Sequence, residues 1–445
     1  MNRYDAIYLA WTPVTVPYFL FKYLFRGKYH ESYPAMRGRR LPSPALSPET
    51  NRVGGRNADG PARGASGNGG PVVWVHAVSV GEVVAARCVI PYLREALPGM
   101  RLFVSTITET GQATARQTLA SEADEIFYYP LDFSWHVNRF LDVYRPNAFV
   151  MLETELWPNM LTLAGGRGVK IFLLNGRLSD RSYPWYRRFR FLFREPLSRL
   201  RACAVQTETD AQRLRALCGP DTPIEVTGNC KFDTPAALLS GADKAALREK
   251  CGLSDGRFVV VAGSTHPGEE EIVLTAWDRA AREFPNATLI VAPRHPERFD
   301  EAARIVARHS LTVSRSSQTD KPRDPQVFLL DEMGVLARLY AIASVAIVCG
   351  SFVPIGGHNI LEPAAHGVPV VYGPHMRKQM EMARIINADR GGVQVAPDGL
   401  SGALLSLMRD ETLRARMGEA ARQAVEANRG SARRSVEFIL PFLKA

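Results

Sequence analysis

Cysteine is scarce in this sequence, and its spacing supports no cysteine chemistry. The 445 residues include six cysteines, with no CxxC pair and no zinc-like spacing with histidine. Most of them lie inside apolar or helical runs, where a small buried thiol is the ordinary interpretation. We therefore predict reduced, structural cysteines in a cytosolic environment.

The sequence also lacks an uninterrupted apolar run of the length that spans a bilayer. Residues 6–21, AIYLAWTPVTVPYFLF, carry no charge, but Pro13 and Pro17 would kink a helix there. A full span needs about 20 apolar residues, and no small-residue cleavage site follows that would indicate a removed signal peptide. Aromatic residues in the run and basic residues after it favour a membrane anchor over residues 1–28, with a buried first helix of a soluble domain as the alternative.

Phosphate-loop and nucleic-acid signatures are absent as well. No GK[ST] follows the paired glycines, no GxGxxG precedes a downstream acid, and no RRM, KH or helix-turn-helix pattern is present. The formal net charge of +10 nevertheless favours an anionic partner, which composition leaves open between nucleic acid, a phosphorylated small molecule and an acidic membrane. Because no nucleic-acid signature accompanies the charge, we expect no nucleic-acid partner.

What the sequence does contain is a repeated alternation of short apolar runs and amphipathic stretches. It fills residues 71–232, pauses over a hinge at 233–244 and restarts over 245–445, and residues 29–70 before it indicate a flexible linker. Continuous apolar strands between helices are typical of parallel βαβ units. We predict an α/β protein with two Rossmann-like, doubly wound domains facing each other across a cleft, and ligands at the carboxyl ends of the strands.

The expected strands are the apolar runs of this alternation. They are Val72–Ala77, Arg101–Thr108, Glu125–Pro130, Ala148–Glu153, Lys170–Asn175, Ala202–Thr207, Phe258–Ser264, Ala287–Pro293, Val327–Asp331, Val345–Gly350 and Val368–Tyr372.

Three acids and one lysine are the candidate catalytic residues of the first half. In HAVSVGEVVAA, Glu82 begins a helix after a strand; it is either a general base aimed into the cleft or a first-turn acid favoured by the helix dipole. MLETELWPN places Glu153 and Glu155 at another strand exit, on one face if the segment is extended. Lys231, just before the hinge, is either a solvated loop charge or a cation for a leaving phosphate.

Two helix starts in the second half are suited to an anion, because the free N–H groups of a helix N-terminus attract negative charge. In AGSTHPGEEE the chain leaves a strand and enters a helix, with Ser264 or Thr265 as the expected cap and Pro267 in the first turn. APRHPER places Arg294 and Arg298 after the next strand.

A third such start is GSFVPIGGHNILEP. Gly356 and Gly357 allow the backbone to approach a ligand closely, and the spacing from Asn359 to Glu362 also fits a simple capping box. Three anion-friendly helix starts on one sheet edge favour a nucleotide site.

The stretch Tyr183–Arg201, YPWYRRFRFLFREPLSRLR, mixes aromatic residues with arginines. It fits an interfacial helix that collects a phosphorylated lipid, or a helix with a basic outer face.

Taken in order, these motifs resemble the 3-deoxy-D-manno-octulosonic acid (Kdo) transferase family of lipopolysaccharide synthesis. The resemblance rests on the aromatic N-terminus and on HAVSVGE, MLETELWPN, NGRLS, TGNCKFD, STHPGEE, PRHPERF and GGHNILEPAAHGVPV. It implies a GT-B glycosyltransferase that transfers Kdo from CMP-Kdo to the lipid A precursor lipid IVA, with inversion and without a metal or a cofactor. It also implies attachment to the anionic lipid surface of the inner membrane on its cytoplasmic side.

The resemblance further implies roles for individual residues. Glu82 is expected to be the proton acceptor, and Glu153 and Lys231 are expected to stabilise the transition state. The expected CMP contacts are Pro293, Arg294, Met333, Gly334, Val335, Asn359, Ile360, Leu361 and Glu362.

Three other functions share parts of this pattern. They are a GT-B transferase that uses a UDP-sugar and a lipid acceptor, a nucleotide-sugar epimerase on the same fold, and a membrane-tethered lipid-binding protein without chemistry. Titration with CMP against UDP separates the first from a CMP-sugar transferase, and Glu82 argues against the last.

Overall fold

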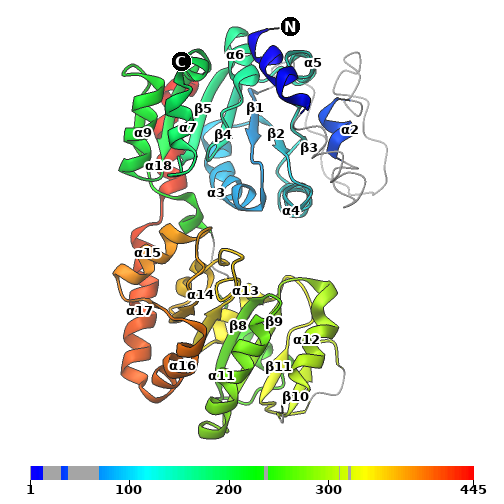
Figure 1. The fold of residues 1–445 in the computed structure, drawn as a ribbon, viewed down its shortest axis with the longest axis vertical. Helices are drawn as coiled ribbons and strands as arrows, with labels where there is room; N and C mark the ends of the chain where they lie inside the picture. The colour runs from blue at the N-terminus through cyan, green and yellow to red at the C-terminus, as the bar shows by residue number, and fades with distance from the viewer. Residues whose placement is uncertain are drawn as a thin grey trace. The chain divides into compact units, whose positions relative to one another are not determined.

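The chain divides into two compact units, Met1–Thr234 together with Gly430–Ala445, and Pro235–Arg429 (Figure 1). The computed structural model describes residues 2–13, 32–38, 70–234, 239–309, 311–318 and 322–444. Most of the predicted anchor and linker, and residues 235–238 of the predicted hinge, lie outside the described residues.

The first unit contains a seven-stranded, all-parallel sheet in the order β3-β2-β1-β4-β5-β6-β7. Its strands are β1 (Val72–His76), β2 (Arg101–Thr106), β3 (Glu125–Tyr128), β4 (Ala148–Leu152), β5 (Lys170–Gly176), β6 (Leu200–Val205) and β7 (Ile224–Val226). The strand order reverses between β1 and β4, and ligands of doubly wound folds bind outside the carboxyl ends of the strands at this point.

Helices cover both faces of this sheet, which explains why its strands are apolar along their whole length. Val73 and Val75 of β1 enter a core with α3, α4 and α18, whereas Trp74 enters the opposite core with α5, α6 and α9. The helices of the unit are α2 (Ser32–Met36), α3 (Val80–Ala96), α4 (Glu109–Leu119), α5 (Ser134–Tyr144), α6 (Pro158–Gly166), α7 (Tyr183–Arg188), α8 (Arg190–Leu197), α9 (Glu208–Cys218), the 3₁₀ turn η1 (Cys230–Asp233) and α18 (Ser431–Lys444).

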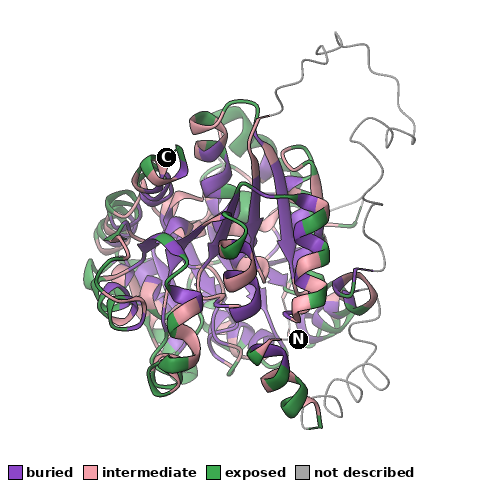
Figure 2. Cartoon of the chain, turned by 90° about the horizontal axis from the view of Figure 1, so that it is seen from above, coloured by how far each residue is buried: buried purple, intermediate pink, exposed green. Residues whose placement is uncertain are grey.

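The second unit repeats this architecture with a sheet in the order β10-β11-β9-β8-β12-β13-β14, again all parallel. Its strands are β8 (Phe258–Thr265), β9 (Ala287–Pro293), β10 (Val313–Arg315), β11 (Val327–Leu329), β12 (Val345–Val348), β13 (Val370–Tyr372) and β14 (Gly392–Gln394). The order reverses between β8 and β12. In Figure 2 the strands are drawn in the colour of buried residues, and the helices carry the exposed surface.

The helices of the second unit pack on both faces of its sheet. α11, α12, α16 and α17 contribute to one core, and α10, α13 and η3 contribute to the other. Their bounds are α10 (Gly241–Lys250), α11 (Glu269–Glu283), η2 (Pro296–Arg298), α12 (Phe299–Val306), α13 (Leu336–Leu339), η3 (Tyr340–Ile342), α14 (Leu361–Ala365), α15 (Met380–Ala388), η4 (Pro397–Gly399), α16 (Leu400–Arg409) and α17 (Glu411–Ala427). The two doubly wound sheets are the GT-B fold class that the sequence predicted.

The C-terminal helix departs from the predicted domain division. The prediction assigned residues 245–445 to the second domain, but α18 belongs to the first unit. Val436 and Ile439 share a core with Val73 of β1, and the Asp233 carboxylate accepts the backbone N–H of Ala432 at 2.6 Å, near the start of the helix. An amphipathic helix can bury its apolar face against either sheet, so tertiary packing decides where it lies.

The first residues of the chain are folded into the first unit. Residues 3–13 are helical, and Tyr4 and Asp5 are 4% and 0% exposed. The Asp5 carboxylate accepts from the backbone N–H and the hydroxyl of Ser134 at 2.8 and 2.6 Å, and from Asn159 Nδ2 at 3.1 Å. Across the described residues, no helix is long and apolar enough to cross a membrane. Part of the predicted anchor is therefore also a packed element of the domain.

Candidate active site

Two acids follow the two strands between which the order of the first sheet reverses. Glu82 lies in the first turn of α3, after β1, and Glu153 directly follows β4. Because β1 and β4 are parallel neighbours, their carboxyl ends lie side by side at one edge of the sheet. The structure thus brings together two of the predicted catalytic residues at the position where the fold class binds its ligands.

Glu82 is buried and held by its own turn. Its carboxylate accepts the backbone N–H of Val78 at 2.6 Å and the hydroxyl of Ser79 at 3.1 Å. Burial and, to a smaller extent, the nearby Glu153 raise the pKa of Glu82, the two hydrogen bonds and Lys231 lower it, and the net pKa is about 7. A carboxylate fixed in place with a pKa near neutrality has the properties of a general base. Glu82 also accepts a backbone N–H beside the first turn of α3, which agrees with the predicted first-turn acid, and its catalytic role stays a prediction.

Glu153 and Lys231 form an ion pair beside Glu82. Lys231 Nζ lies 2.6 Å from Glu153 Oε1, and both side chains are about one-fifth exposed, at 20% and 21%. Lys231 Nζ also lies 3.4 Å from the position that a Cβ at Gly81 would occupy, so the cation borders the Glu82 turn. Lys231 is therefore a partly buried, paired cation and not a solvated loop charge.

Glu153 adopts a backbone conformation that few non-glycine residues adopt. Its φ is +59°, and its N–H donates to the carbonyl of Leu174 at 3.1 Å. Such a conformation costs on the order of 1 kcal/mol or more and persists where the surroundings require it, often at functional sites. Asn175, in the NGRLS segment, has a φ of +54° and accepts the N–H of Cys230 at 3.0 Å, next to Lys231. Strained residues just after β4 and near the end of β5 thus position both members of the ion pair.

Glu155 is a third acid of this cluster, and the sequence indicated no role for it beyond its place at the strand exit. Burial, together with the nearby Glu82 and Glu153, raises its pKa to about 8. Burial and neighbouring carboxylates thus raise the pKa of both Glu82 and Glu155. The signal that could have found Glu155 is its spacing of two residues from Glu153.

In the second unit, a buried glutamate of α11 accepts hydrogen bonds from the backbone of the GSFVPIGG loop. The Glu269 carboxylate is fully buried and accepts the N–H groups of Gly350, Ser351 and Phe352 at 2.6, 3.1 and 2.9 Å, and that of His266 at 3.0 Å. These N–H groups of the GSFVPIGG loop are thus satisfied by a side chain of α11. The loop is held rigidly, and its ligand contacts must come from other groups.

The predicted start of α11, the helix after β8, was wrong. Ser264 and Thr265 are the last residues of β8 and not caps, and α11 begins at Glu269 after Gly268, whose φ is +90°. The chain stays extended through Thr265 because the strand pairs with Pro293 of β9 at that position.

Asn359 and Glu362 contact each other, but they do not form the predicted alternative, a capping box. Asn359 Oδ1 accepts the N–H of Leu361 at 3.0 Å, and Asn359 Nδ2 donates to Glu362 Oε1 at 3.1 Å. α14 begins at Leu361 without a side-chain cap on its N-cap residue, Ile360. Burial raises the pKa of Glu362, and the Asn359 hydrogen bond and the Arg294 charge lower it.

The other predicted CMP contacts lie at the ends of neighbouring strands. Pro293 ends β9, and the backbone N–H of Arg294 donates to the carbonyl of Thr265 at 3.0 Å. The Arg294 side chain is exposed, and within the described part of the chain it makes no hydrogen bond or ion pair. Met333, Gly334 and Val335 lie between β11 and α13, with Met333 53% exposed. Ile360 and Leu361 are buried, so they offer a ligand only their backbone.

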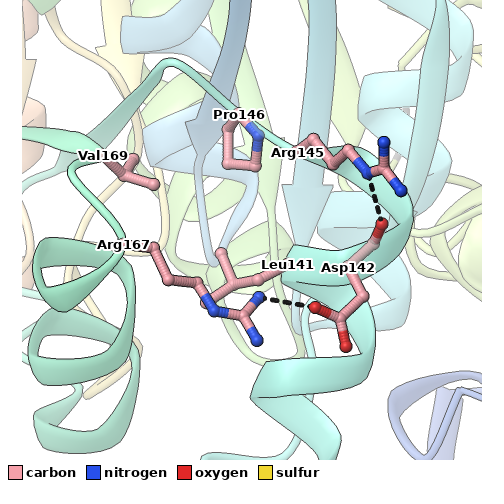
Figure 3. Close-up of a pocket in the computed structure, with 6 residues that line it drawn as sticks. All are labelled: Leu141, Asp142, Arg145, Pro146, Arg167 and Val169. Carbon is pink, nitrogen blue, oxygen red and sulfur yellow. Dashed lines mark hydrogen bonds and ion pairs between the residues drawn. The ribbon is translucent and has the colours of Figure 1, made fainter.

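A separate pocket of about 540 Å³ opens at the opposite edge of the first sheet. Arg145 and Pro146 precede β4 and Val169 precedes β5, so the pocket lies at the amino ends of the strands. In Figure 3, Asp142 lies between two arginines, with its carboxylate 2.9 Å from Arg167 Nη1 and its carbonyl 3.2 Å from Arg145 Nε. The predicted catalytic residues are not among its lining.

Comparison with known proteins gives the following matches. Residues 51–234 match a family model described as 3-Deoxy-D-manno-octulosonic-acid transferase (kdotransferase). The chain is 33% identical over 379 residues to the 3-deoxy-D-manno-octulosonic acid transferase of Haemophilus influenzae, covering 84% of this chain and 87% of that protein.

Two solved structures share the fold. The UDP-GlcNAc 2-epimerase of Neisseria meningitidis matches with a TM-score of 0.59 at 14% identity, over 83% of this chain and 100% of that one. MurG of Acinetobacter baumannii matches with a TM-score of 0.52 at 13% identity, over 83% of this chain and 99% of that one. At such identities, these two likenesses concern the fold alone.

Proposed function

Because this chain belongs to the 3-deoxy-D-manno-octulosonic acid transferase family, we propose that it transfers Kdo from CMP-Kdo to the lipid A precursor lipid IVA. Membership of this family makes the protein a glycosyltransferase that transfers Kdo in lipopolysaccharide biosynthesis. The observation that carries the proposal is the Glu82 carboxyl, held at a strand exit beside the Glu153–Lys231 ion pair.

The first unit supplies the base. An acceptor hydroxyl is a poor nucleophile until a base takes its proton in the transition state. Glu82 takes that proton, and its pKa of about 7 allows it to be deprotonated at neutral pH and to accept the proton with little penalty. Glu153 orients Lys231 through the 2.6 Å ion pair, and Lys231 offsets negative charge that develops during transfer.

The second unit supplies the nucleotide site. CMP carries one phosphate, and Arg294 is an exposed cation without an ion pair among the described residues at the end of β9. Glu362 and Asn359, linked by a hydrogen bond of 3.1 Å, follow β12 through the glycine loop. Backbone groups at Met333–Val335 and Asn359–Glu362 complete the proposed contacts, which suits positions such as Ile360 whose side chains are buried.

The proposed stereochemistry and metal independence follow from the same residues. One in-line displacement by the activated hydroxyl inverts the configuration at the anomeric carbon of Kdo. The charge of the single leaving phosphate is met by Arg294 and the helix start near Asn359, in place of a metal ion. The transfer needs no cofactor in this scheme.

The proposed location is the cytoplasmic side of the inner membrane. Trp185 and Phe191 on α7 and α8 are each 66% exposed, and the arginines between them are exposed as well. The helical residues 3–13 adjoin α8, because the Tyr4 hydroxyl donates to the carbonyl of Leu192 at 2.9 Å. Aromatic and basic side chains on one surface are suited to an anionic lipid surface.

A turnover assay tests the proposed function. The full chain is incubated with CMP-Kdo and lipid A precursor, and lipid products are separated by mass, with UDP-GlcNAc as the alternative donor. We expect Kdo-bearing lipid from CMP-Kdo only. Transfer or epimerisation with the UDP-sugar, and none with CMP-Kdo, would overturn the proposal.

A further inference from the structure

Two histidines meet at the position where the strand order of the second sheet reverses. His266 directly follows β8, and His358 lies in the loop that connects β12 to α14. β8 and β12 are parallel neighbours, so both histidines lie at the carboxyl edge of the sheet. The proposed function gives neither residue a role, although each flanks a segment expected to bind the nucleotide.

The two imidazole rings share one hydrogen bond. His266 Nε2 lies 2.7 Å from His358 Nε2, and the ring planes are within 7° of each other with centroids 5.0 Å apart. A hydrogen bond between two ring nitrogens needs one donor and one acceptor, so the neutral pair must contain opposite tautomers. The tautomer that donates through Nε2 has a lone pair on its own Nδ1, and that atom can take up one further proton.

The surrounding loop fixes the pair in this arrangement. Gly350 has a φ of +70°, and a Cβ at this position would lie 2.6 Å from His358 Cδ2. The Glu269 carboxylate accepts the N–H groups of both Gly350 and His266, which ties the two loops together. His266 is 7% exposed. The backbone around His266 and the backbone around His358 therefore both hold the two rings in contact.

Charged groups on every neighbouring element act on this pair. The cations are Arg294, His295 when protonated, Arg298 and Lys378, and the acids on the adjoining helices are Glu269, Glu270 and Glu362. Arg298 is neutralised by Glu270, with Nη1 2.5 Å from Oε1, and the Glu269 carboxylate is occupied by backbone N–H groups. Arg294 and Lys378 remain as exposed cations.

This environment keeps the pair neutral in the absence of an anion. Burial, followed by His295 and Arg294, lowers the pKa of His266 to about 4. Burial also lowers the pKa of His358 to about 3, with Arg294 as the next cause. An anion placed among these cations would reverse their effect, since an opposite charge within about 4–6 Å raises the pKa of a histidine by roughly 1–3 units.

We propose that His266 and His358 form a proton-sharing pair that takes up one proton from solvent when the anionic donor binds, and that the resulting imidazolium recognises the charge of that donor. The proton adds to the free Nδ1, and the Nε2–H···Nε2 bond then becomes charge-assisted and stronger. A second proton would remove the acceptor and break the bond, so uptake stops at one. This inference rests on the proposed function, because it requires the second unit to hold the nucleotide.

Calorimetry measures the uptake directly. CMP and CMP-Kdo are titrated separately into the full chain near pH 6, in two buffers with different ionisation enthalpies, and the difference in heat gives the number of protons bound. The same titrations are made on His358→Gln and His266→Gln, which keep an amide at the Nε2 position but cannot be protonated. Subtracting the result for a variant removes any proton that the nucleotide phosphate itself takes up or releases.

We expect the wild-type chain to take up about 0.5–1 proton more than either variant, and its dissociation constant to fall by up to about tenfold per pH unit below neutrality, relative to the variants. Uptake with CMP alone identifies the phosphate as the anion, and uptake only with CMP-Kdo identifies the sugar carboxylate. His309→Gln, which removes a histidine bonded to Asp278 in the same unit, should keep the wild-type uptake.

Tight binding of either nucleotide with equal proton uptake in wild type and both variants overturns the inference and leaves the proposed donor site intact. Failure of both nucleotides to bind overturns the proposed donor site itself. If one glutamine variant does not fold, as judged by circular dichroism, the other decides between these outcomes.

Discussion

The two units repeat one architecture but present opposite chemistry at the equivalent position. In each, the strand order of a parallel sheet reverses beside the first strand of the unit, between β1 and β4 or between β8 and β12. The first reversal carries Glu82, Glu153 and Glu155, with one lysine among them. The second carries His266 and His358 among arginines and a lysine.

This difference separates what the fold determines from what the side chains determine. The fold brings two strand exits together, and the pKa changes then follow the local charges. Burial and like charges raise the pKa of Glu82 in the first unit, and burial and like charges lower the pKa of His358 in the second. The acidic edge is suited to accept a proton from an uncharged hydroxyl, and the basic edge is suited to hold an anion.

The largest expected effect comes from a variant that removes a carboxylate from the acidic edge only. Glu82→Gln should lower kcat by about 10²–10⁴-fold, because general-base catalysis contributes that much. In the wild type, kcat/KM should rise through about pH 7 as the Glu82 carboxyl loses its proton. Glu95→Gln, at the exposed end of the same helix, is the matched control and should retain activity.

The stability of this variant has a definite sign. The folded-state pKa of Glu82 lies above its usual range, so its charge costs stability as pH rises towards about 7. Glu82→Gln should therefore melt no earlier than the wild type at alkaline pH. An active variant, or one that melts early at every pH, would reduce Glu82 to a helix-start residue.

The next effect concerns the basic edge. Glu362→Ala should weaken CMP binding by about ten- to a hundredfold, the equivalent of a charge-assisted hydrogen bond of roughly 1.5–3 kcal/mol. Its melting temperature should change little, because Glu362 does not bond the backbone of the N-cap residue of α14. Asn359→Ala should weaken binding and also lower the melting temperature, because Asn359 accepts the N–H of Leu361.

A true capping box elsewhere in the same unit provides the control. Asp243 and Ser240 form one at the start of α10, where Asp243 accepts from the Ser240 backbone N–H at 3.0 Å. Asp243→Ala should lower stability by about 0.5–2 kcal/mol and leave CMP binding unchanged. If Glu362→Ala behaves like Asp243→Ala, Glu362 belongs to the helix and not to the site.

A third prediction separates the packed part of the N-terminal segment from the surface of α7 and α8 that we propose binds lipid. Asp5→Ala removes the buried acceptor of the Ser134 N–H and hydroxyl and should cost about 1–3 kcal/mol of unfolding free energy, measured by denaturant titration. Phe191→Ser, at a side chain that is 66% exposed, should instead weaken binding to anionic vesicles with little change in stability. The reverse pattern would contradict both assignments.

The smallest expected effect is a shift in the pH dependence of the acidic edge. Lys231 lowers the pKa of Glu82, so Lys231→Met should move the midpoint of the pH–rate profile upwards by about one pH unit or less. Lys231→Arg, which keeps the charge, should leave the midpoint near that of the wild type. A midpoint that falls in Lys231→Met would show that another group is the base.

The fold was largely predictable because buried parallel strands leave continuous apolar runs in the sequence. The strands that the prediction missed, β7, β10 and β14, are three residues long and lie at or next to the edges of the sheets, with a polar or charged residue in each. Such strands depend on pairing with a neighbour and leave little pattern of their own.

A site residue could be predicted only where its type and its position after a strand were signal enough. Glu153 and Arg294 directly follow strands, Glu82 lies in the first turn of the helix after one, and all three could be found from that position. Glu269 and His358 could not, because their roles arise from contacts across the fold: the Glu269 bond to Gly350 joins residues 81 apart, and the histidine contact joins residues 92 apart. Tertiary structure alone brings such pairs together.

One measurement tests whether the acidic edge accepts the proton and the basic edge alone binds the nucleotide. It is the dissociation constant of CMP for Glu82→Gln and Arg294→Met, titrated side by side by calorimetry. The account predicts wild-type affinity within about twofold for Glu82→Gln, and a loss of about ten- to a hundredfold for Arg294→Met, because only the second variant removes a charge from the donor site. Equal weakening in both variants, or wild-type affinity in Arg294→Met, would contradict it.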